Sequence, residues 1–329
     1  MKTVTITKAK SLTAVALAAA GMLAGGAANA GIVTQWNFST DANFIVAPDP
    51  VPSGAAYPTW TGAPGVALQD KLIWGENLGT QDYRNLTSPA GGSATPAQSA
   101  LTIGTDYITT PAPGDNGEHR DDGGPQNGSV ATKINGVGGT TGIGISLTHW
   151  NNPIAGSAST LTSGSLFDTL SLTPTAWNGS MGTTATQSAP DVLFNFKFLE
   201  TANVGTCPGG PGGSTCDDFF GFDFINISAI PFVYDNELYD LSIVYLDPLN
   251  PNLPAQPFSV LPSDVCSLMS LSPNCVGFRT VEGAATTAQF GFQIEHVPEP
   301  ASLALLGLGL GSIGLVGRRR RATGGATAA

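Results

Sequence analysis

The chain has 329 residues, including 42 glycines and 24 prolines, so about a fifth of it favours turns and loops, below the level typical of a disordered chain. Residues 31–296 contain 6 Lys or Arg and 23 Asp or Glu, which gives this part a formal charge of −17. Nucleic acid and anionic lipid are poor partners for a surface this acidic, whereas cations and neutral glycans suit it, as does solubility in a crowded surface layer.

Residues 1–30 have the pattern of a secretory signal peptide. Lys2, Lys8 and Lys10 precede an apolar run over 12–23, and Ala28 and Ala30 frame a small-residue cleavage site. Such a segment is removed on export and belongs to no fold. We therefore expect the Sec translocon and signal peptidase as partners, and residues 31–296 as the exported body.

The other end, residues 297–321, combines three features in a fixed order. Pro298, Glu299 and Pro300 come first, an uncharged run over 301–316 follows, and an arginine cluster closes it: Arg318, Arg319, Arg320 and Arg321. As a helix the uncharged run would rise about 24 Å, short of the roughly 30 Å hydrocarbon layer, and snorkelling arginines could cover the difference. The arginines favour the cytoplasmic side, which places the body across the membrane. Residues 322–329 form a short tail.

This triplet resembles the PEP-CTERM sorting signal of Gram-negative bacteria. The resemblance implies recognition by an exosortase, a membrane-embedded cysteine enzyme that cuts near the motif and passes the protein outward. It also implies a transient inner-membrane anchor with the body in the periplasm, followed by release to the cell surface or outside. A permanent transmembrane anchor is the alternative.

Between the two ends the apolar residues alternate with a period of two. We expect strands over 31–39, 71–74, 98–103, 143–150, 161–172, 192–199, 220–224, 238–246 and 288–294. Loops are expected over 47–65, 86–97 and 109–128, and no window of about 12 residues has a helical face. The pattern predicts an all-β body, an antiparallel β-sandwich of jelly-roll type.

Four cysteines form two pairs, Cys207 with Cys216 and Cys266 with Cys275, each nine positions apart. Four cysteines allow three connectivities. An oxidising compartment and the equal spacings favour two local disulfides, whereas zinc sites have tighter spacing.

Several short strings resemble the THxN family of PEP-CTERM proteins. Its naming motif matches Thr148, His149 and Asn151. Other matching strings are Leu72-Ile73-Trp74-Gly75, Gln98-Ser99 with Leu101, Phe198-Leu199-Glu200-Thr201 with Asn203 and Cys207, and Cys275 with Gly277-Phe278-Arg279-Thr280-Val281-Glu282. Ile73 departs from the pattern, where a basic residue is more usual. The resemblance implies export and no assigned activity.

His149 is the residue most easily taken for a catalytic group. Alternation places it on the face of Ile145 and Leu147, where it would bond a turn backbone group around 151–153, with Thr148 on the opposite face. The chain has no G-x-S-x-G and no H-E-x-x-H string. We therefore expect no catalytic residue; a secreted hydrolase would need His149 in an open pocket beside a nucleophile and a carboxylate.

Acidic side chains offer two places for a cation. Asp115, Asp121 and Asp122 share one loop, and a second set flanks the first cysteine pair: Glu200, Asp217 and Asp218. Calcium takes about six to eight oxygens, and neither set has EF-hand or RTX spacing. We expect no metal or other cofactor, with calcium at the second set as the open alternative. Sugar rings could stack on Trp60, Trp150 or Trp177, although such residues more often lie in a core or its rim.

These features favour a non-enzymatic exported protein. It would be sorted to the cell surface or extracellular matrix and associate with exopolysaccharide in a biofilm. The alternatives are a glycan- or calcium-binding β-sandwich module and, more remotely, a secreted hydrolase.

Overall fold

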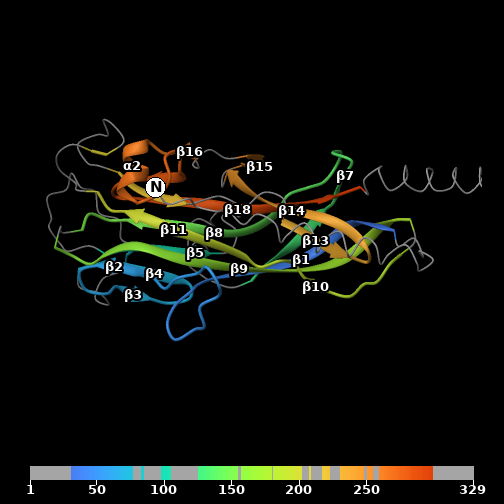
Figure 1. The fold of residues 1–329 in the computed structure, drawn as a ribbon, viewed down its shortest axis with the longest axis horizontal. Coiled ribbons are helices and arrows are strands. Elements are labelled where there is room, and N and C mark those ends of the chain that lie inside the picture. Colours follow the sequence, from blue (N-terminus) through green and yellow to red (C-terminus); the bar gives the residue numbers. More distant parts are fainter. Residues whose placement is uncertain are drawn as a thin grey trace, which may run out of the picture.

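The structure, a computed structural model, describes residues 31–76, 83–84, 98–104, 125–154, 157–179, 181–201, 207–208, 217–222, 230–247, 250–254 and 259–298. These residues form two nine-stranded sheets. The long strands run along the length of the molecule, and the short helix α2 (Ser263–Leu268) lies at one end (Figure 1). The prediction of an all-β, sandwich-like fold is confirmed.

The first sheet has the order β16 (Ser259–Val260), β17 (Val276–Thr280), β12 (Asp218–Phe222), β11 (Val192–Leu199), β9 (Thr160–Asn178), β1 (Ile32–Phe44) and β6 (Gln126–Ala131). Two short strands, β2 (Thr59–Thr61) and β10 (Gln187–Ser188), also pair with β9. Neighbouring strands of this sheet run antiparallel to one another.

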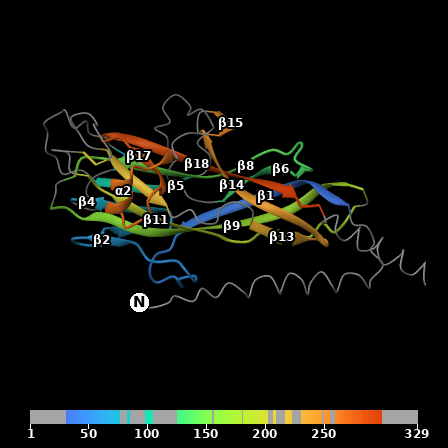
Figure 2. The ribbon, with the colours of Figure 1, turned by 45° about the horizontal axis from the view of Figure 1, so that its top comes forward.

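The second sheet has the order β13 (Ile230–Tyr234), β14 (Glu237–Asp247), β18 (Ala284–His296), β8 (Gly142–Asn151), β5 (Gln98–Gly104), β4 (Lys71–Gly75) and β3 (Val66–Ala67). β15 (Asn250–Pro254) joins β14 antiparallel, and β7 (Lys133–Ile134) joins β18 in parallel. Figure 2 shows the same strands from a second direction, with β9 and β18 again spanning most of the body.

The core lies between the sheets because each inner strand turns alternate apolar side chains inward. In β11 the residues Phe194, Phe196 and Phe198 are buried, while Asn195 and Lys197 between them are exposed. Phe194 of the first sheet meets Phe290 of the second with ring centroids 5.5 Å apart. Contacts of this kind between the two inner faces hold the sandwich closed.

Most predicted strands are present, and several extend beyond their predicted limits. β1 continues to Phe44 and β9 to Asn178, although the apolar alternation weakens, because each extension pairs with the other strand. The end of β1 pairs with residues 166–170 of β9, and the end of β9 pairs with residues 32–37 of β1. Two loop predictions are wrong in part. β2 lies within the loop predicted over 47–65, and β6 occupies the end of the loop predicted over 109–128. Both strands are mainly polar, so they lack the apolar signal on which the prediction relied.

The disulfide prediction is confirmed for Cys266 and Cys275, whose Cα atoms are 5.8 Å apart. It joins α2 to the residue before β17. Cys207 is also disulfide-bonded, and Cys216 lies outside the described residues. Within the described ranges no helix is long and apolar enough to cross a membrane. The predicted signal peptide with Ala28 and Ala30, the predicted C-terminal helix and the segment 86–97 lie outside those ranges.

Candidate functional site

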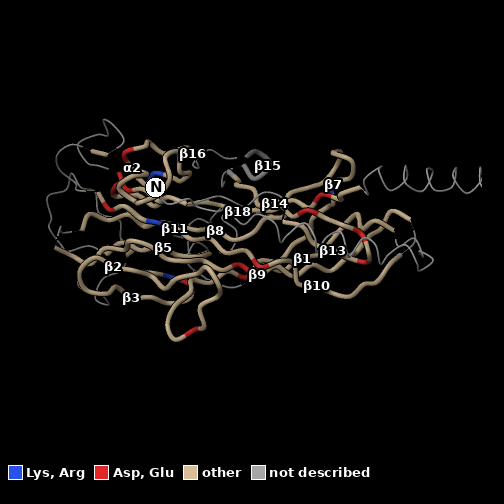
Figure 3. The backbone as a smooth tube through the Cα atoms, viewed as in Figure 1, with Lys and Arg blue, Asp and Glu red and all other residues tan. Residues whose placement is uncertain are grey.

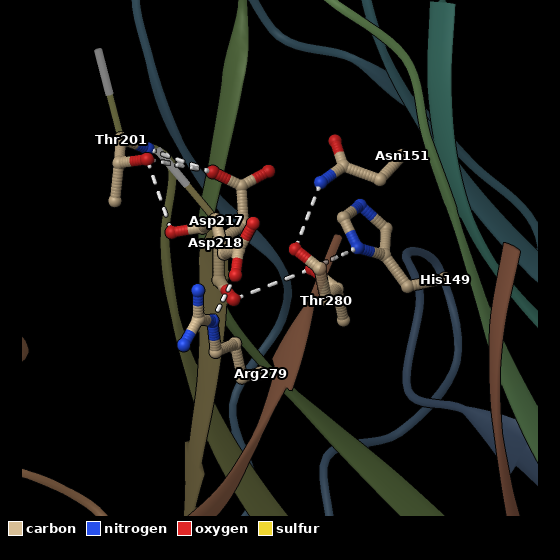
Figure 4. A network of polar contacts seen from close by, with 7 residues as sticks. All are labelled: His149, Asn151, Thr201, Asp217, Asp218, Arg279 and Thr280. Carbon is tan, nitrogen blue, oxygen red and sulfur yellow. Dashed lines mark hydrogen bonds and ion pairs between the residues drawn. The ribbon is translucent and has the colours of Figure 1, made fainter. Parts of the chain in front are cut away.

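Five segments that are distant in sequence meet near the end of the sandwich that carries α2. They are the ends of β4, β8, β11 and β17 and the start of β12, and Figure 1 shows the β11 arrow ending toward α2. Their residues include most of those on which the THxN resemblance rests. Side chains from both sheets therefore contribute to one cluster of polar residues inside the molecule, and Figure 4 shows part of this cluster.

His149 is fully buried near the end of β8. Its ring stacks on Trp74 with centroids 5.3 Å apart and planes inclined by 13°, and its Nδ1 lies 2.9 Å from the hydroxyl of Thr280. That hydroxyl donates to the carbonyl oxygen of Asp218 at 3.3 Å, so it accepts a hydrogen from Nδ1. Burial lowers the pKa of His149 to about 3, which leaves a neutral ring with its proton on Nδ1.

The predicted partner of His149 was wrong. It bonds a side chain of the opposite sheet, Thr280, instead of turn backbone around 151–153. The alternation itself holds, because Thr148 faces the other way and meets Thr287 of β18 at 2.9 Å. The hydrogen-bond partner of His149 depends on which strand of the facing sheet lies opposite it, and the sequence alone did not show that strand.

Asn151, two residues further along β8, shares this face and this partner. Its Nδ2 donates to the backbone oxygen of Thr280 at 3.3 Å, and its Oδ1 has no hydrogen-bond partner although the residue is fully buried. The spacing of His149 and Asn151 thus lets both side chains reach one residue of the facing sheet. Together they join β8 to β17 across the interior.

Three carboxylates gather beside this link: Glu200, Asp218 and Glu282. One oxygen of each lies within 4.8 Å of an oxygen of each of the others. Asp218 is fully buried and its Oδ1 accepts the backbone N–H of Thr201 at 2.8 Å, while Glu200 Oε2 accepts the indole N–H of Trp74 at 3.3 Å. The second oxygen of each, Glu200 Oε1 and Asp218 Oδ2, is buried without a hydrogen bond.

The surroundings of these carboxyls favour their neutral forms. Burial, reinforced by the neighbouring charge of Glu282, raises the pKa of Glu200 to about 8. Burial and the charges of Glu200 and Glu282 hold the pKa of Asp218 well above its usual range, against the opposing hydrogen bond from Thr201. In the absence of another positive charge, the group must keep protons or remain strained by mutual repulsion.

The predicted cation candidates need one correction. Asp217 precedes Asp218 and points the other way, where it forms an ion pair with the half-exposed Arg279 (Figure 4). Glu282 takes the third place instead. Adjacent residues of a strand face opposite sides, which explains why Asp217 and Asp218 cannot both join the cluster. Glu282 was overlooked although it ends one of the strings that carry the THxN resemblance.

The remaining candidates lie elsewhere. Trp150 is almost fully buried and donates its indole N–H to Thr102, so it belongs to the core, whereas Trp60 and Trp177 are half-buried. Asp115, Asp121 and Asp122 lie outside the described residues, as do the sorting-motif residues other than Pro298.

A separate carboxyl, Asp168, borders a small cavity between the sheets, together with Phe194 and Phe290. The hydroxyl of Thr40 donates to it. Burial raises the pKa of Asp168 to about 6, helped by the charges of Asp41 and Asp191 and opposed by the Thr40 hydrogen bond. Thr40 already satisfies one oxygen of Asp168, and no other carboxyl of the described residues lines this cavity, so Asp168 lacks the grouped oxygens found at Glu200.

The fold and the interior cluster define an all-β protein of two facing sheets with a cluster of polar side chains buried at one end. The C-terminus then adds a specific assignment, because residues 296–321 match the PEP-CTERM protein-sorting motif. This motif supports a PEP-CTERM protein and indicates exosortase-dependent sorting of an exported protein to the cell surface. No curated protein and no solved structure matches the chain. The THxN assignment stays a resemblance.

Proposed function

We propose that this chain is a non-enzymatic component of the cell surface or extracellular matrix that associates with exopolysaccharide. The sorting motif over 296–321 carries the proposal. A protein cut at this motif leaves its predicted C-terminal membrane segment behind and is released as a folded body, which suits a secreted structural component.

The way the fold ends supports this order of events. β18 closes the second sheet between β14 and β8, and Val297 N still donates to Leu238 O at 2.9 Å. The motif begins where this last pairing ends. A cut after Pro298 would therefore remove no strand of the two sheets.

The composition of the body supports an extracellular setting. Acidic residues occur at many places along the described backbone and basic residues at few (Figure 3). Disulfides such as Cys266–Cys275 persist in oxidising compartments. An acidic, disulfide-bonded body of this kind resists aggregation in a crowded outer layer.

The non-enzymatic part of the proposal draws on the environment of His149. A hydrolase mechanism would need this imidazole in an open pocket beside a nucleophile. His149 is instead fully buried, stacked on Trp74 and bonded to Thr280. Its contacts serve to join the two sheets.

Intact-mass analysis of the protein recovered from the native host tests the sorting step. We expect a C-terminus near residue 298 in the wild type, and an uncut, membrane-bound chain after deletion of the exosortase or in Glu299→Gln. Glu295→Gln is the matched control, because it makes the same change four residues earlier on β18 and should leave processing unaffected. Secreted wild-type protein that retains Arg318–Arg321 would contradict the proposal.

The matrix association has its own test. In a strain unable to make exopolysaccharide, we expect the cleaved protein to move from the cell-associated fraction to the medium. Unchanged retention in that strain would contradict the exopolysaccharide link while leaving the sorting step intact.

A further inference from the structure

We propose that Glu200, Asp218 and Glu282, together with the amide oxygen of Asn151, bind a Ca²⁺ ion inside the sandwich. This inference concerns the folded body and does not depend on the sorting of the chain.

The spacing of the carboxylates fits an ion of this size. Ca²⁺ holds its oxygens at about 2.3–2.6 Å, so two ligands on opposite sides of the ion are separated by roughly 5 Å at most. One oxygen from each of Glu200, Asp218 and Glu282 lies within 4.8 Å of the others. The three groups can therefore contact a single ion with little movement.

Asn151 provides an independent indication of a ligand. Its Oδ1 is buried and accepts no hydrogen bond. The amide cannot be reversed, because the backbone oxygen of Thr280 can only accept a hydrogen bond and therefore needs the NH₂ group of Asn151 facing it. In Figure 4 this Oδ1 and the second oxygen of Asp218 lie on the same side of the Thr280 link. A buried amide oxygen left in this state costs free energy unless something else binds it.

The charge balance points the same way. Ionised carboxylates are costly to bury unless a positive charge accompanies them. Neither Glu200 nor Asp218 forms an ion pair with a described Lys or Arg, and Arg279 is engaged by Asp217 on the opposite face. A divalent cation would neutralise most of the charge and bind the orphan oxygens of Glu200, Asp218 and Asn151 at once.

The donor atoms favour calcium over zinc. Carboxylate and amide oxygens are hard ligands that suit Ca²⁺, whereas zinc sites in proteins are built mainly from thiolate and imidazole. Cys207, Cys266 and Cys275 are all in disulfides, and His149 is not within the group of mutually close ligand atoms. Mg²⁺ is smaller and retains several waters, which a buried group of side chains accommodates less well.

Ion binding would act on the fold at a defined place. Asp218 begins β12, Glu200 and Glu282 follow β11 and β17, and all three strands belong to the first sheet; Asn151 ends β8 of the second. An ion held by all four residues ties the sheets together at the α2 end. The stability of the exported body would then depend on the calcium concentration outside the cell.

Terbium luminescence and thermal unfolding test this inference on the full-length chain, expressed with its own signal peptide, purified in detergent and freed of metal with a chelator. Trp74 donates a hydrogen bond to Glu200, so Tb³⁺ in the site should emit strongly when tryptophan is excited. We expect Ca²⁺ to displace Tb³⁺ and to raise the melting temperature, which should keep rising with free Ca²⁺ above the Kd.

Two neutral, equal-sized variants remove ligands, and a third is the matched control. Glu200→Gln and Asp218→Asn should each weaken Ca²⁺ binding at least about tenfold, and without metal each should melt no lower than the wild type, because carboxylate repulsion is relieved. Asp217→Asn makes the same change one residue away, at a carboxylate that faces Arg279, and should keep wild-type affinity.

A folded wild type with neither sensitised terbium emission nor a Ca²⁺-dependent melting temperature would overturn the inference, and shared protons would then account for the cluster. Binding of Zn²⁺ in preference to Ca²⁺ would overturn the calcium assignment. Equal losses of affinity in Asp217→Asn and Asp218→Asn would show that the effect is only the general charge of the body.

Discussion

The two ends of the sandwich fill the space between the sheets with different side chains. At the end that carries β13, which we term the aromatic end, Trp36 packs edge-on against Tyr234 and Tyr239 at centroid distances of 5.1 and 5.4 Å. The Trp36 indole N–H donates to Thr132, and the Tyr239 hydroxyl accepts Val33 N–H, each at 2.9 Å. At the other, carboxylate end, Trp74 packs on His149 and donates to Glu200.

The difference lies in the buried oxygens that lack a hydrogen-bond partner. At the aromatic end the indole of Trp36 and the hydroxyl of Tyr239 both have partners, and the described buried atoms without one are ring nitrogens of Trp177 and His296. At the carboxylate end Asn151, Glu200 and Asp218 each keep a buried oxygen without a hydrogen bond. An apolar filling would be more stable than such a cluster, so its presence suggests a ligand.

The largest expected effect is the loss of the aromatic anchor. Trp36→Ala should lower the free energy of unfolding by about 3–5 kcal/mol, because it leaves a cavity among fully buried rings. The calcium-dependent increment in stability should persist, since the change lies at the other end. Chemical denaturation with and without Ca²⁺ measures both quantities, and loss of that increment would show that the two ends are not independent.

The disulfide beside the carboxylate end should have the next largest effect. The double variant Cys266→Ser/Cys275→Ser frees a loop of about ten residues, which should cost roughly 2–3 kcal/mol. Because α2 packs on Phe219 of β12, we expect weaker Ca²⁺ binding as well. Unchanged denaturation midpoints under oxidising conditions would refute the stabilising role of this bond.

Without metal, the carboxylate end should make stability fall as pH rises. Glu200 has its pKa raised to about 8 and Asp218 also has a raised pKa, so the folded state binds more protons than the unfolded state between pH 4.5 and 8. A tenfold difference in proton affinity between the two states is worth about 1.4 kcal/mol. Relaxation of the cluster reduces the full effect, so we expect a loss of about 1–2 kcal/mol over this range, measured by urea denaturation in chelator.

Other ionisable groups near the cluster also affect the pH dependence of stability. The effect of His149 is opposite in sign to that of the carboxyls: its pKa is lowered to about 3, so it destabilises the fold as pH falls below 6.5. Asp217 and Arg279 neutralise each other on the outer face, and Glu282 belongs to the cluster itself. Glu200→Gln should flatten the decline in chelator, and a profile identical to that of the wild type would contradict the assignment.

The smallest effect is expected at the outer ion pair. The side chain of Arg279 is 52% exposed whereas that of Asp217 is 8% exposed, so water screens the guanidinium and can solvate it when the carboxylate is replaced. Asp217→Asn should change the free energy of unfolding by less than about 1 kcal/mol. A larger loss, measured by urea denaturation, would mean that Asp217 also supports the carboxylate cluster.

The sequence predicted the parts of this molecule that depend on local pattern. Both bounds of β11 were predicted correctly because its phenylalanines alternate with polar side chains. The Cys266–Cys275 disulfide was predicted from the spacing of the cysteines. β6 was missed because it is a polar strand held by its pairing with β1. Only part of the cluster was predicted. Glu200 and Glu282 are separated in the chain by strands β12 to β17 and by α2, so their proximity depends on the order of the strands in the sheets.

The calcium content of the purified protein tests the central claim most directly. Full-length chain equilibrated with Ca²⁺ and separated from free ion should carry about one tightly held Ca²⁺ per molecule by elemental mass spectrometry, and Asp218→Asn should carry almost none. Folded wild-type protein with no more calcium than Asp218→Asn would contradict the account.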